Sequence, residues 1–292
     1  MTSDSVGALL DSIQRWVDEL MPDAERGRRL VTAARAAAPD PSAEVDATVC
    51  ERVAAAARTG SRHLDLEYVP AGDLVPDRAS PGWDPPDPVR VRRRAGAVAR
   101  VSRCSEGVAT IALDGLDDVG LAAEYVDAAF ALARGCRGLL LDLRANRGGD
   151  LATAALVIGR LLGGARVRLS TVVYADREKQ WWTPGLRGDR ELAGTPVAVL
   201  TSAATFSSAE ALAYHLKARQ RVTVVGEATG GAADHITPIR LTRHVRGTLP
   251  HGYVIDARTG TNWEGTGVLP DVECPADDAP ARAHSLLCDS RQ

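Results

Sequence analysis

The chain has 292 residues, of which 45% are hydrophobic and 25% charged, and its formal net charge is -3. This is an ordinary globular composition, sufficient for one large domain and a smaller one. The near-neutral balance argues against a nucleic-acid-binding protein, which would carry a strong basic excess. The dense basic run at residues 90–94 is short, and we interpret it as a solvated strand edge or linker.

Cysteine usage and the N-terminal sequence set further expectations. The five cysteines form no Cys-x-x-Cys pair, so their spacing predicts neither a disulfide framework nor a zinc site. Cys136 directly precedes an apolar segment and is expected in the core. The N-terminus lacks a basic stretch followed by an apolar one, which argues against a secretory signal. Apolar runs fall far short of the ~20 residues that span a bilayer. We therefore expect a cytoplasmic protein with no membrane span, no metal and no cofactor.

Residues 1–60 are predicted to form a small N-terminal helical bundle. Apolar residues recur at helical spacing up to Leu20, and Pro22 interrupts this pattern. A second helix is expected from Asp23 to Ala37. A third is expected to open at Ser42 and to stop at residues 59–60.

Residues 61–105 are predicted to join this bundle to a larger domain. Residues 61–68 alternate polar and apolar side chains as a strand does. Prolines punctuate residues 69–89, which is typical of a linker or an extended covering loop. This arrangement leaves no room for an inserted peptide-binding domain.

Residues 106–292 are predicted to form the main domain, and the pattern that begins just before them alternates strands with helices. Strands are expected at residues 98–101, 108–113, 138–143, 168–174, 197–201 and 222–226. Helices are expected at residues 121–134, 151–162 and 208–218. The continuous apolar run at 138–143 is typical of a buried parallel strand. The alternation predicts an α/β fold.

Two loops each follow a buried strand and lead into a helix, where ligands gather in open α/β sheets. The first loop, residues 142–150, contains Gly148 and Gly149. A glycine backbone can approach a substrate closely, and two adjacent N–H groups at a helix start can build an oxyanion hole. A plain glycine-rich turn is the alternative interpretation.

The second loop, residues 200–210, contains Ser207. This serine precedes a predicted helix, whose dipole would stabilise a developing negative charge. The alternative is that Ser207 and Ser208 are helix N-caps, with Glu210 completing a capping pattern.

Four motifs occur in a fixed order along the chain: D-L-R-A-N-R-G-G, T-F-S-S-A-E, V-V-G-E-A-T-G-G and N-W-E-G-T-G-V-L-P-D. Together they resemble the family of tail-specific (C-terminal processing) proteases, tricorn core proteases and interphotoreceptor retinoid-binding proteins, over residues 60–275. The helical N-terminus resembles the retinoid-binding-protein branch, without a peptide-binding insert. The resemblance implies a crotonase-like (ClpP-type) α/β core and peptide-bond hydrolysis by a serine nucleophile.

The resemblance also implies roles for individual residues. Ser207 would be the nucleophile, and Glu210 and Thr229 match positions that support it. Three residues would offer backbone N–H groups to the oxyanion: Gly148, Gly149 and Ser208.

The general base distinguishes the branches of this family. Tail-specific proteases place a lysine three residues after the threonine of the G-E-x-T element, and Ala232 occupies that position here. The tricorn-like branch uses a histidine and a glutamate instead, which match His63 and Glu264. His235 lies near the same loop and is the rival base. Histidine is suited to this task because a serine needs a nearby base at neutral pH.

We therefore expect a serine peptidase, or a related acyl-transfer hydrolase, that acts on a peptide or small acyl substrate; a homo-oligomer is left open. One alternative is a non-catalytic binder of a hydrophobic small molecule, because one fold can serve many functions. Another is a biosynthetic tailoring hydrolase or cyclase.

Overall fold

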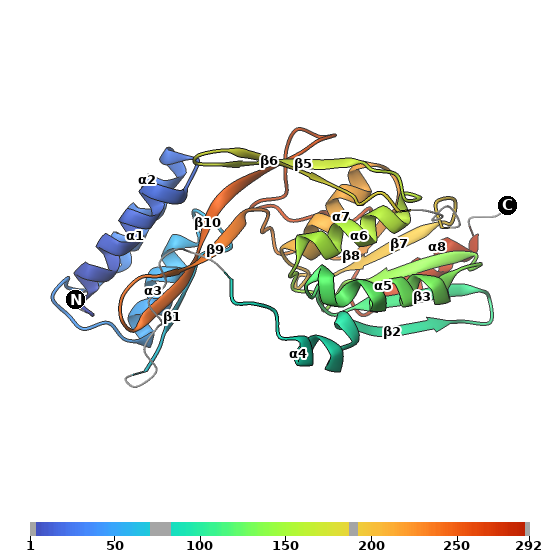
Figure 1. Ribbon diagram of the computed structural model, residues 1–292, viewed down its shortest axis with the longest axis horizontal. Helices are drawn as coiled ribbons and strands as arrows, with labels where there is room; N and C mark the ends of the chain where they lie inside the picture. The colour runs from blue at the N-terminus through green and yellow to red at the C-terminus, as the bar shows by residue number, and fades with distance from the viewer. Residues whose placement is uncertain (1–3, 71–82, 187–191, 290–292) are drawn as a thin grey trace. The chain divides into compact units, whose positions relative to one another are not determined.

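The computed structural model describes residues 4–70, 83–186 and 192–289 (Figure 1). The chain divides into two compact units, and each draws on several stretches of the sequence. The first consists of residues 1–84, 172–179 and 234–254, and the second of residues 85–171, 180–233 and 255–292. The contiguous domain boundaries expected from the sequence stay a prediction. Residues 71–82 of the expected proline-rich segment lie outside the described residues.

Three helices open the first unit: α1 (Val6–Leu20), α2 (Ala24–Ala37) and α3 (Ala47–Ala57). The first two helices lie where the sequence predicted them, on either side of Pro22. The expected start of the third helix at Ser42 is wrong, because Asp46 is the N-cap and its carboxylate accepts a 2.7 Å hydrogen bond from Val49 N–H. That bond satisfies a free donor of the first turn, which is why the helix begins there.

These helices share a core with a sheet. Its strands are β1 (Asp65–Tyr68), β5 (Arg168–Tyr174), β6 (Glu178–Trp182), β9 (His235–Arg240) and β10 (Val245–Asp256). The order is β1-β10-β5-β6, and β9 pairs with the first part of β10. Leu9, Leu30 and Val53 from the helices are fully buried in the same cluster as Leu64 and Val245. The helices therefore rest on strands as well as on one another.

The second unit contains a six-stranded sheet in the order β11-β8-β7-β4-β3-β2. The strands not yet given are β2 (Val98–Arg103), β3 (Val108–Leu113), β4 (Gly138–Asp142), β7 (Val197–Thr201), β8 (Thr223–Gly226) and β11 (Val272–Glu273). All neighbours pair in parallel except β2, which runs antiparallel to β3. β4 and β7 are buried along their whole length, as their apolar sequences predicted.

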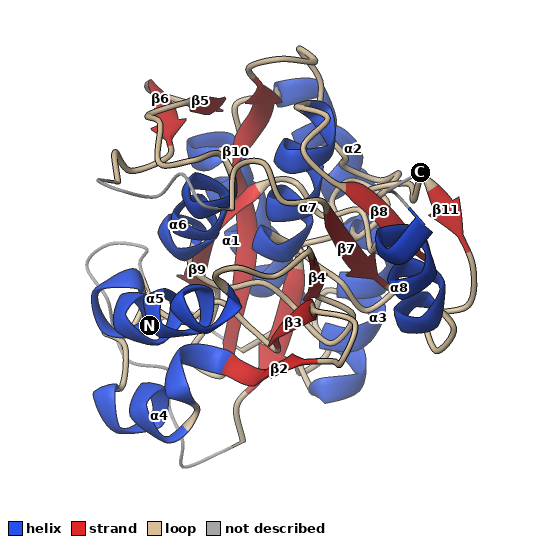
Figure 2. Ribbon diagram, turned by 90° about the vertical axis from the view of Figure 1, so that its right-hand side faces the viewer, coloured by secondary structure: helices blue, strands red, loops and turns tan. Residues whose placement is uncertain are grey.

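Helices cover both faces of this sheet (Figure 2). α5 (Val119–Ala133), α6 (Leu151–Leu161) and α7 (Ser208–Ala218) lie on one side, and α8 (Ala279–Asp289) lies on the other. On the α8 side, Leu140 and Leu200 pack in one cluster with Ala283 and Leu287. Cys136 is buried, as expected.

The basic run at 90–94 is neither a strand edge nor a plain linker. Most of it forms a short helix, α4 (Pro88–Arg93), followed by the 3-10 turn η1 (Ala95–Ala97). Asp87 caps α4 and Pro88 opens it, since proline fits the first helical position without loss of a needed donor.

The fold is therefore a mixed α/β architecture with two sheets. The crotonase-like topology and a self-contained N-terminal bundle stay predictions. Within the described residues, no helix combines the length and the apolar character that crossing a membrane requires.

Candidate active site

The two loops singled out in the sequence leave the sheet at neighbouring positions. β4 and β7 are adjacent and parallel, so their carboxyl ends lie at the same edge of the sheet. Side chains of the second loop then bind the backbone of the first: Ser202 Oγ donates to the Arg144 carbonyl at 2.7 Å, and Thr205 Oγ1 to the Leu143 carbonyl at 2.9 Å. The two loops thus form one hydrogen-bonded structure.

Gly148 brings the glycine loop against Ser207. Its φ is +91°, and a Cβ built on it would lie 2.8 Å from the Phe206 carbonyl oxygen and 2.9 Å from both Ser207 Cβ and Ser208 N. Gly149 has φ +135°, and its Cβ would clash with the Leu116 carbonyl. Both positions therefore need glycine for its conformation and for space.

The N–H groups of the glycine pair have different surroundings. Gly148 N–H donates to Asn146 Oδ1 at 2.8 Å, and Asn146 is fully buried. Gly149 accepts a 2.8 Å hydrogen bond from Ser208 Oγ on its carbonyl. Within the described part of the chain, no protein acceptor pairs with the N–H of Gly149 or of Ser208.

Ser207 is the N-cap of α7, but its backbone is not that of an ordinary cap. Its φ and ψ are 54° and −123°, in a region that a side-chain-bearing residue rarely adopts. The N-caps Ser5, Asp46 and Asp150 all have extended backbones, as caps usually do. A sharp, strained turn between a strand and a helix is the geometry that exposes a nucleophilic serine.

Glu210 ties Ser207 to a third loop. Its fully buried carboxylate accepts hydrogen bonds from Ser207 N–H (2.7 Å) and Ala232 N–H (2.9 Å) on Oε2, and from Gly231 N–H (2.7 Å) and the Thr229 hydroxyl (2.5 Å) on Oε1. Burial raises the pKa of the Glu210 carboxyl, while these four hydrogen bonds favour the charged form and oppose the rise.

The predicted capping pattern is thus present, since Glu210 lies at the third helical position and binds the N–H of the cap residue. Capping and catalysis are not exclusive at this position. The same carboxylate that caps α7 also fixes the backbone of residues 229–232.

A fourth loop, residues 262–268, forms hydrogen bonds with residues 229–233 of the third loop. Glu264 Oε2 accepts a 2.6 Å hydrogen bond from Ala233 N–H. Trp263 is buried and its indole N–H donates to the Ala232 carbonyl at 3.2 Å. Val268 N–H donates to Thr229 Oγ1 at 2.7 Å. Glu264 therefore fixes the backbone directly after the segment that Glu210 fixes.

His63 belongs to the first unit, in the turn between α3 and β1. It is buried, with 6% of its surface exposed. The backbone N–H of His63 donates to Ser61 Oγ at 3.3 Å, and its backbone carbonyl accepts from the Thr248 hydroxyl at 2.8 Å. The strand predicted at 61–68 begins only at Asp65, so His63 lies in the turn that precedes it.

His235, the rival base, is the first residue of β9 in the same unit. Its Nδ1 lies 2.9 Å from the Tyr174 hydroxyl. Burial, assisted by the nearby charges of His251, Lys179 and His63, lowers the pKa of His235 to about 3. A histidine of such low basicity is a weak general base at neutral pH.

A largely buried ion pair, which no sequence pattern predicted, holds the turn that contains His63. Asp234 forms a 2.6 Å salt bridge with Arg26 and accepts a 3.3 Å hydrogen bond from Ser61 Oγ. Arg26 also donates to the Gly60 carbonyl at 2.5 Å. Arg26, the adjacent pair Gly60 and Ser61, and Asp234 are far apart in the sequence, so no spacing rule connects them.

A second buried pair lies two helical turns beyond Ser207. His215 Nδ1 is 2.7 Å from Asp256 Oδ2, and Arg219 lies 3.2 Å from the same oxygen. Burial lowers the pKa of His215, although Asp256 acts against this shift. Eight residues of helix rise about 12 Å, so His215 is not placed to serve Ser207.

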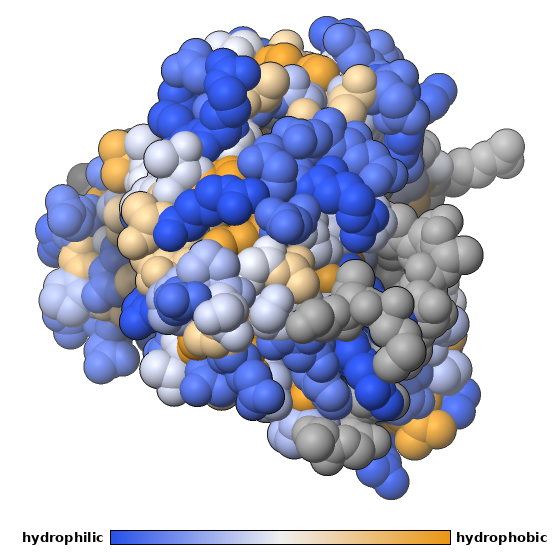
Figure 3. All heavy atoms as spheres, turned by 90° about the vertical axis from the view of Figure 1, so that its left-hand side faces the viewer, coloured by the Kyte–Doolittle hydropathy of each residue, from blue (hydrophilic) through white to orange (hydrophobic). Residues whose placement is uncertain are grey.

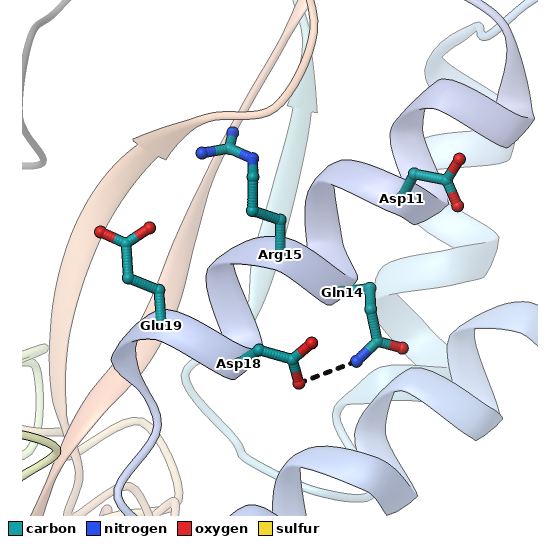
Figure 4. A pocket seen from close by; sticks show the side chains of 5 residues that line it. All are labelled: Asp11, Gln14, Arg15, Asp18 and Glu19. Carbon is teal, nitrogen blue, oxygen red and sulfur yellow. Dashed lines mark hydrogen bonds between the residues drawn. The ribbon is translucent and has the colours of Figure 1, made fainter.

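None of these groups lines a surface hollow of the first unit. This hollow lies on the polar face of α1 (Figure 4) and is lined by Asp11, Gln14, Arg15, Asp18 and Glu19. One hydrogen bond, from Gln14 to Asp18 at 2.9 Å, joins two of them. Hydrophilic surface predominates in the view of Figure 3, in which apolar side chains form only separate patches. We interpret the hollow as a solvated helix face.

Proteins of known structure share the fold of this chain. A lipoprotein from Streptococcus agalactiae has a similar structure, with a TM-score of 0.65, 19% identity, and coverage of 100% of this chain and 99% of that one. A candidate peptidase from Parabacteroides merdae aligns with a TM-score of 0.69 and 16% identity over 97% of this chain and 96% of its own. At these identities the likeness concerns the fold.

A candidate S41 protease from Bacteroides fragilis aligns with a TM-score of 0.53 and 22% identity, over 62% of this chain and 51% of its own. The sequence profile of Peptidase family S41 matches residues 107–274, more than half of the chain, and this range includes the glycine loop, Ser207, Glu210 and Glu264. The chain belongs to peptidase family S41.

Proposed function

We propose that this protein is a serine peptidase, or a closely related acyl-transfer hydrolase, with Ser207 as its nucleophile. The observation that carries the proposal is the backbone of Ser207, at φ 54° and ψ −123°, beside Gly148. Such strain costs about 1–3 kcal/mol and persists only where the surroundings enforce it. Helix capping does not require it, because Ser5, Asp46 and Asp150 cap their helices with extended backbones.

The oxyanion would be held by backbone N–H groups. Ser208 N–H and Gly149 N–H are the best candidates, since no protein acceptor among the described residues pairs with them. Gly148 N–H already donates to Asn146 Oδ1, so Gly148 would contribute mainly by having no side chain, which leaves space for the substrate. Donors fixed before the reaction stabilise the charge without reorganisation.

The general base would be His63, with Glu264 in the supporting network. His63 would accept the Ser207 proton as Oγ attacks the substrate carbonyl, and would then pass that proton to the leaving amine. A water molecule would hydrolyse the acyl-enzyme in the second half of the reaction. The low basicity of His235 favours His63 over it.

The rest of the predicted set would hold the site in place. Glu210 and Thr229 would fix the backbone on both sides of the nucleophile, as their hydrogen bonds suggest. A peptide is the proposed substrate because the family is one of peptidases. The cytoplasmic location and a homo-oligomeric state stay predictions.

The proposal is tested by hydrolysis of a mixed peptide library, with new termini identified by mass spectrometry. The wild-type chain should cleave, and Ser207→Ala should lose activity by on the order of 10⁴-fold or more. Ser208→Ala is the matched control, because it keeps the backbone N–H and should retain most activity. Equal cleavage by wild type and Ser207→Ala would reject the nucleophile, and no cleavage by any variant would favour a ligand-binding role.

A further inference from the structure

A cluster of metal-ligand side chains lies outside the candidate active site. Cys104 follows β2 and Glu106 lies two residues later, in the turn that joins β2 to β3. His284 and Cys288 lie on α8. Cys104 Sγ is 3.5 Å from His284 Nε2, and Cys288 Sγ is 3.8 Å from the same nitrogen.

The fold explains why these residues meet. His284 and Cys288 are four residues apart, so they share one face of α8. That helix packs against the sheet through Ala279, Ala283 and Leu287, which brings its ligand-bearing face to the β2–β3 turn. The turn itself is closed by a 3.0 Å hydrogen bond from Gly107 N–H to the Cys104 carbonyl.

One of these distances matches that of a tetrahedral zinc site. Zinc binds thiolate sulfur at about 2.3 Å and imidazole nitrogen at about 2.1 Å, so a tetrahedral S···N edge measures roughly 3.6 Å. The distance from Cys104 Sγ to His284 Nε2, 3.5 Å, is close to that value. Cys288 Sγ lies 3.8 Å from Nε2 and 3.9 Å from Nδ1 of the same ring, so it favours neither nitrogen. The ligand atoms of Cys104, Glu106 and His284 all lie within 4.8 Å of one another.

We propose that this cluster binds one thiophilic divalent cation, with Zn²⁺ the best fit, through Cys104, His284 and Glu106. One thiolate, one imidazole and one carboxylate leave the fourth position of a tetrahedral ion to Cys288, after a change of its side-chain rotamer, or to a water molecule. The same set is unattractive to Mg²⁺ or Ca²⁺, which prefer oxygen ligands. The cation would fasten α8 to the β2–β3 turn, so its role would be structural.

Binding of the cation releases protons and involves no oxidation or reduction. Cys104 releases its thiol proton as its sulfur binds, and His284 binds as the neutral imidazole. Binding therefore weakens as the pH falls. None of the proposed ligands belongs to the proposed hydrolytic machinery, so the site is independent of the proposed function.

The expectation of no metal depended on the absence of Cys-x-x-Cys pairs, and this site needs no such pair. Here two ligands come from a hairpin turn and the third from a C-terminal helix. Cys104 and His284 are 180 residues apart in the sequence. Only the packing of α8 reveals them as one group.

The test uses the full chain, freshly reduced and freed of metal, titrated with Zn²⁺ and separately with Co²⁺. We expect one cation per chain, a thiolate-to-cobalt charge-transfer band, and an upward shift of Tm by a few degrees with Zn²⁺, about the size that tight binding produces. Cys104→Ser and His284→Ala should each weaken affinity by more than about 10-fold, the low end for loss of even an outer-shell partner.

Cys274→Ser is the control, because Cys274 is partly buried on the same side of the sheet but does not belong to the ligand set. It should leave affinity and the cobalt spectrum unchanged. Both ligand variants should keep the metal-free Tm of the wild type, since Cys104 is exposed and His284 half-buried. No charge-transfer band, a stoichiometry well below one, or unchanged affinity in both ligand variants would overturn the proposal.

Discussion

At the residue scale, backbone conformation separates Ser207 from the other serine and aspartate caps of the chain. A cap needs an extended backbone so that its side chain can reach the first turn. Ser207 instead has φ 54°, and the Gly148 and Glu210 contacts fix it there. The surroundings therefore enforce a strained conformation at the proposed nucleophile.

Replacing Ser207 by glycine should show this strain directly. Glycine adopts positive φ at little cost, so Ser207→Gly should raise the free energy of unfolding by about 1 kcal/mol while it abolishes hydrolysis. Ser5→Gly is the matched control, because Ser5 has an extended backbone and caps Ala8 N–H. There the change should lower stability by a few tenths of a kcal/mol. Chemical denaturation measures both, and a loss of stability in Ser207→Gly similar to that in Ser5→Gly would contradict the strain.

The two candidate bases predict different mutant kinetics. His63→Ala should lower kcat by on the order of 10²–10⁴-fold, because it removes the proton acceptor, and His235→Ala should lower it much less. The wild-type rate should fall on the acidic side of pH ~6.5, before local shifts, as an imidazole protonates. Because the pKa of His235 is lowered to about 3, His235 as the base would place this limb far lower. Rate profiles from pH 4 to 9 distinguish the two.

At the element scale, the glycine loop and the loop before α7 owe their contact to the parallel pairing of β4 and β7. A substitution in one loop should therefore act on the other. Gly148 is the point of closest approach, where a Cβ would meet the Ser207 side chain and the Ser208 nitrogen.

Gly148→Ala should inactivate the enzyme by at least about 10²-fold, because the added methyl group displaces the nucleophile by a fraction of an ångström or more. Gly135→Ala is the matched control: it also has positive φ, at +70°, but its Cβ would meet nothing within 4 Å. Both variants should lose about 1 kcal/mol of stability from backbone strain. Gly148→Ala should lose more, because its Cβ also overlaps the Phe206 carbonyl and Ser207, and only this variant should lose activity. Parallel measurements of kcat/KM and Tm separate the two effects.

If a metal binds at the Cys104 cluster and catalysis needs no metal, a chelator should affect stability but not activity. A chelator should lower the Tm of zinc-loaded protein, because it removes a ligand of the native state. It should leave peptide hydrolysis intact, since Ser207 and its neighbours include no metal-ligand cluster among the described residues. Activity lost on chelation and restored by zinc would contradict a metal-free mechanism.

Local sequence signals predicted several strands and helices with the correct bounds. β3, β5, β7 and α7 have the predicted bounds, because each is a continuous apolar or periodic run between turn residues. The sequence did not reveal β10, since Gly247, Pro250 and Gly252 interrupt its pattern and the register shifts between the last two. It did not reveal β6 either, whose residues are mostly polar and exposed.

The candidate site shows the same division between local and non-local information. The sequence predicted that Gly148 and Ser207 each lie in a loop between a strand and a helix. This prediction was possible because each strand, loop and helix is continuous in the sequence. The four donors to Glu210 were not, although the capping pattern pointed to one of them. The Arg26–Asp234 pair could not be predicted, because its partners meet only after the chain has folded.

At the scale of the whole molecule, the proposed catalytic groups belong to different compact units. Ser207, Gly149 and Glu264 are in the second unit, and His63 and His235 are in the first. Each unit has its own apolar cluster, and each contains a histidine whose pKa burial lowers: His215 in the second and His235 in the first. Acid should therefore affect the stability of both units.

Stability should fall as the pH drops below ~6.5, the pKa of histidine in the unfolded chain. Because the folded-state pKa of His215 and of His235 is lowered, the unfolded chain binds protons that the folded chain does not. The stabilisation is fully present above pH ~6.5 and is lost as the pH falls, by at most about 1.4 kcal/mol per pH unit for each histidine. For His235 this loss continues to about pH 3. His235→Asn should reduce the slope of unfolding free energy against pH, and an unchanged slope would refute the assignment.

The central claim is that Ser207 is a nucleophile activated by His63, and covalent labelling tests it most directly. The wild-type protein, His63→Ala and Ser208→Ala would be treated with a fluorophosphonate, and the modified residue identified by peptide mass spectrometry. We predict a single adduct on Ser207, formed at a similar rate in Ser208→Ala and on the order of 10²-fold or more slowly in His63→Ala. An adduct on another serine, or a labelling rate that does not change when His63 is removed, would contradict the account.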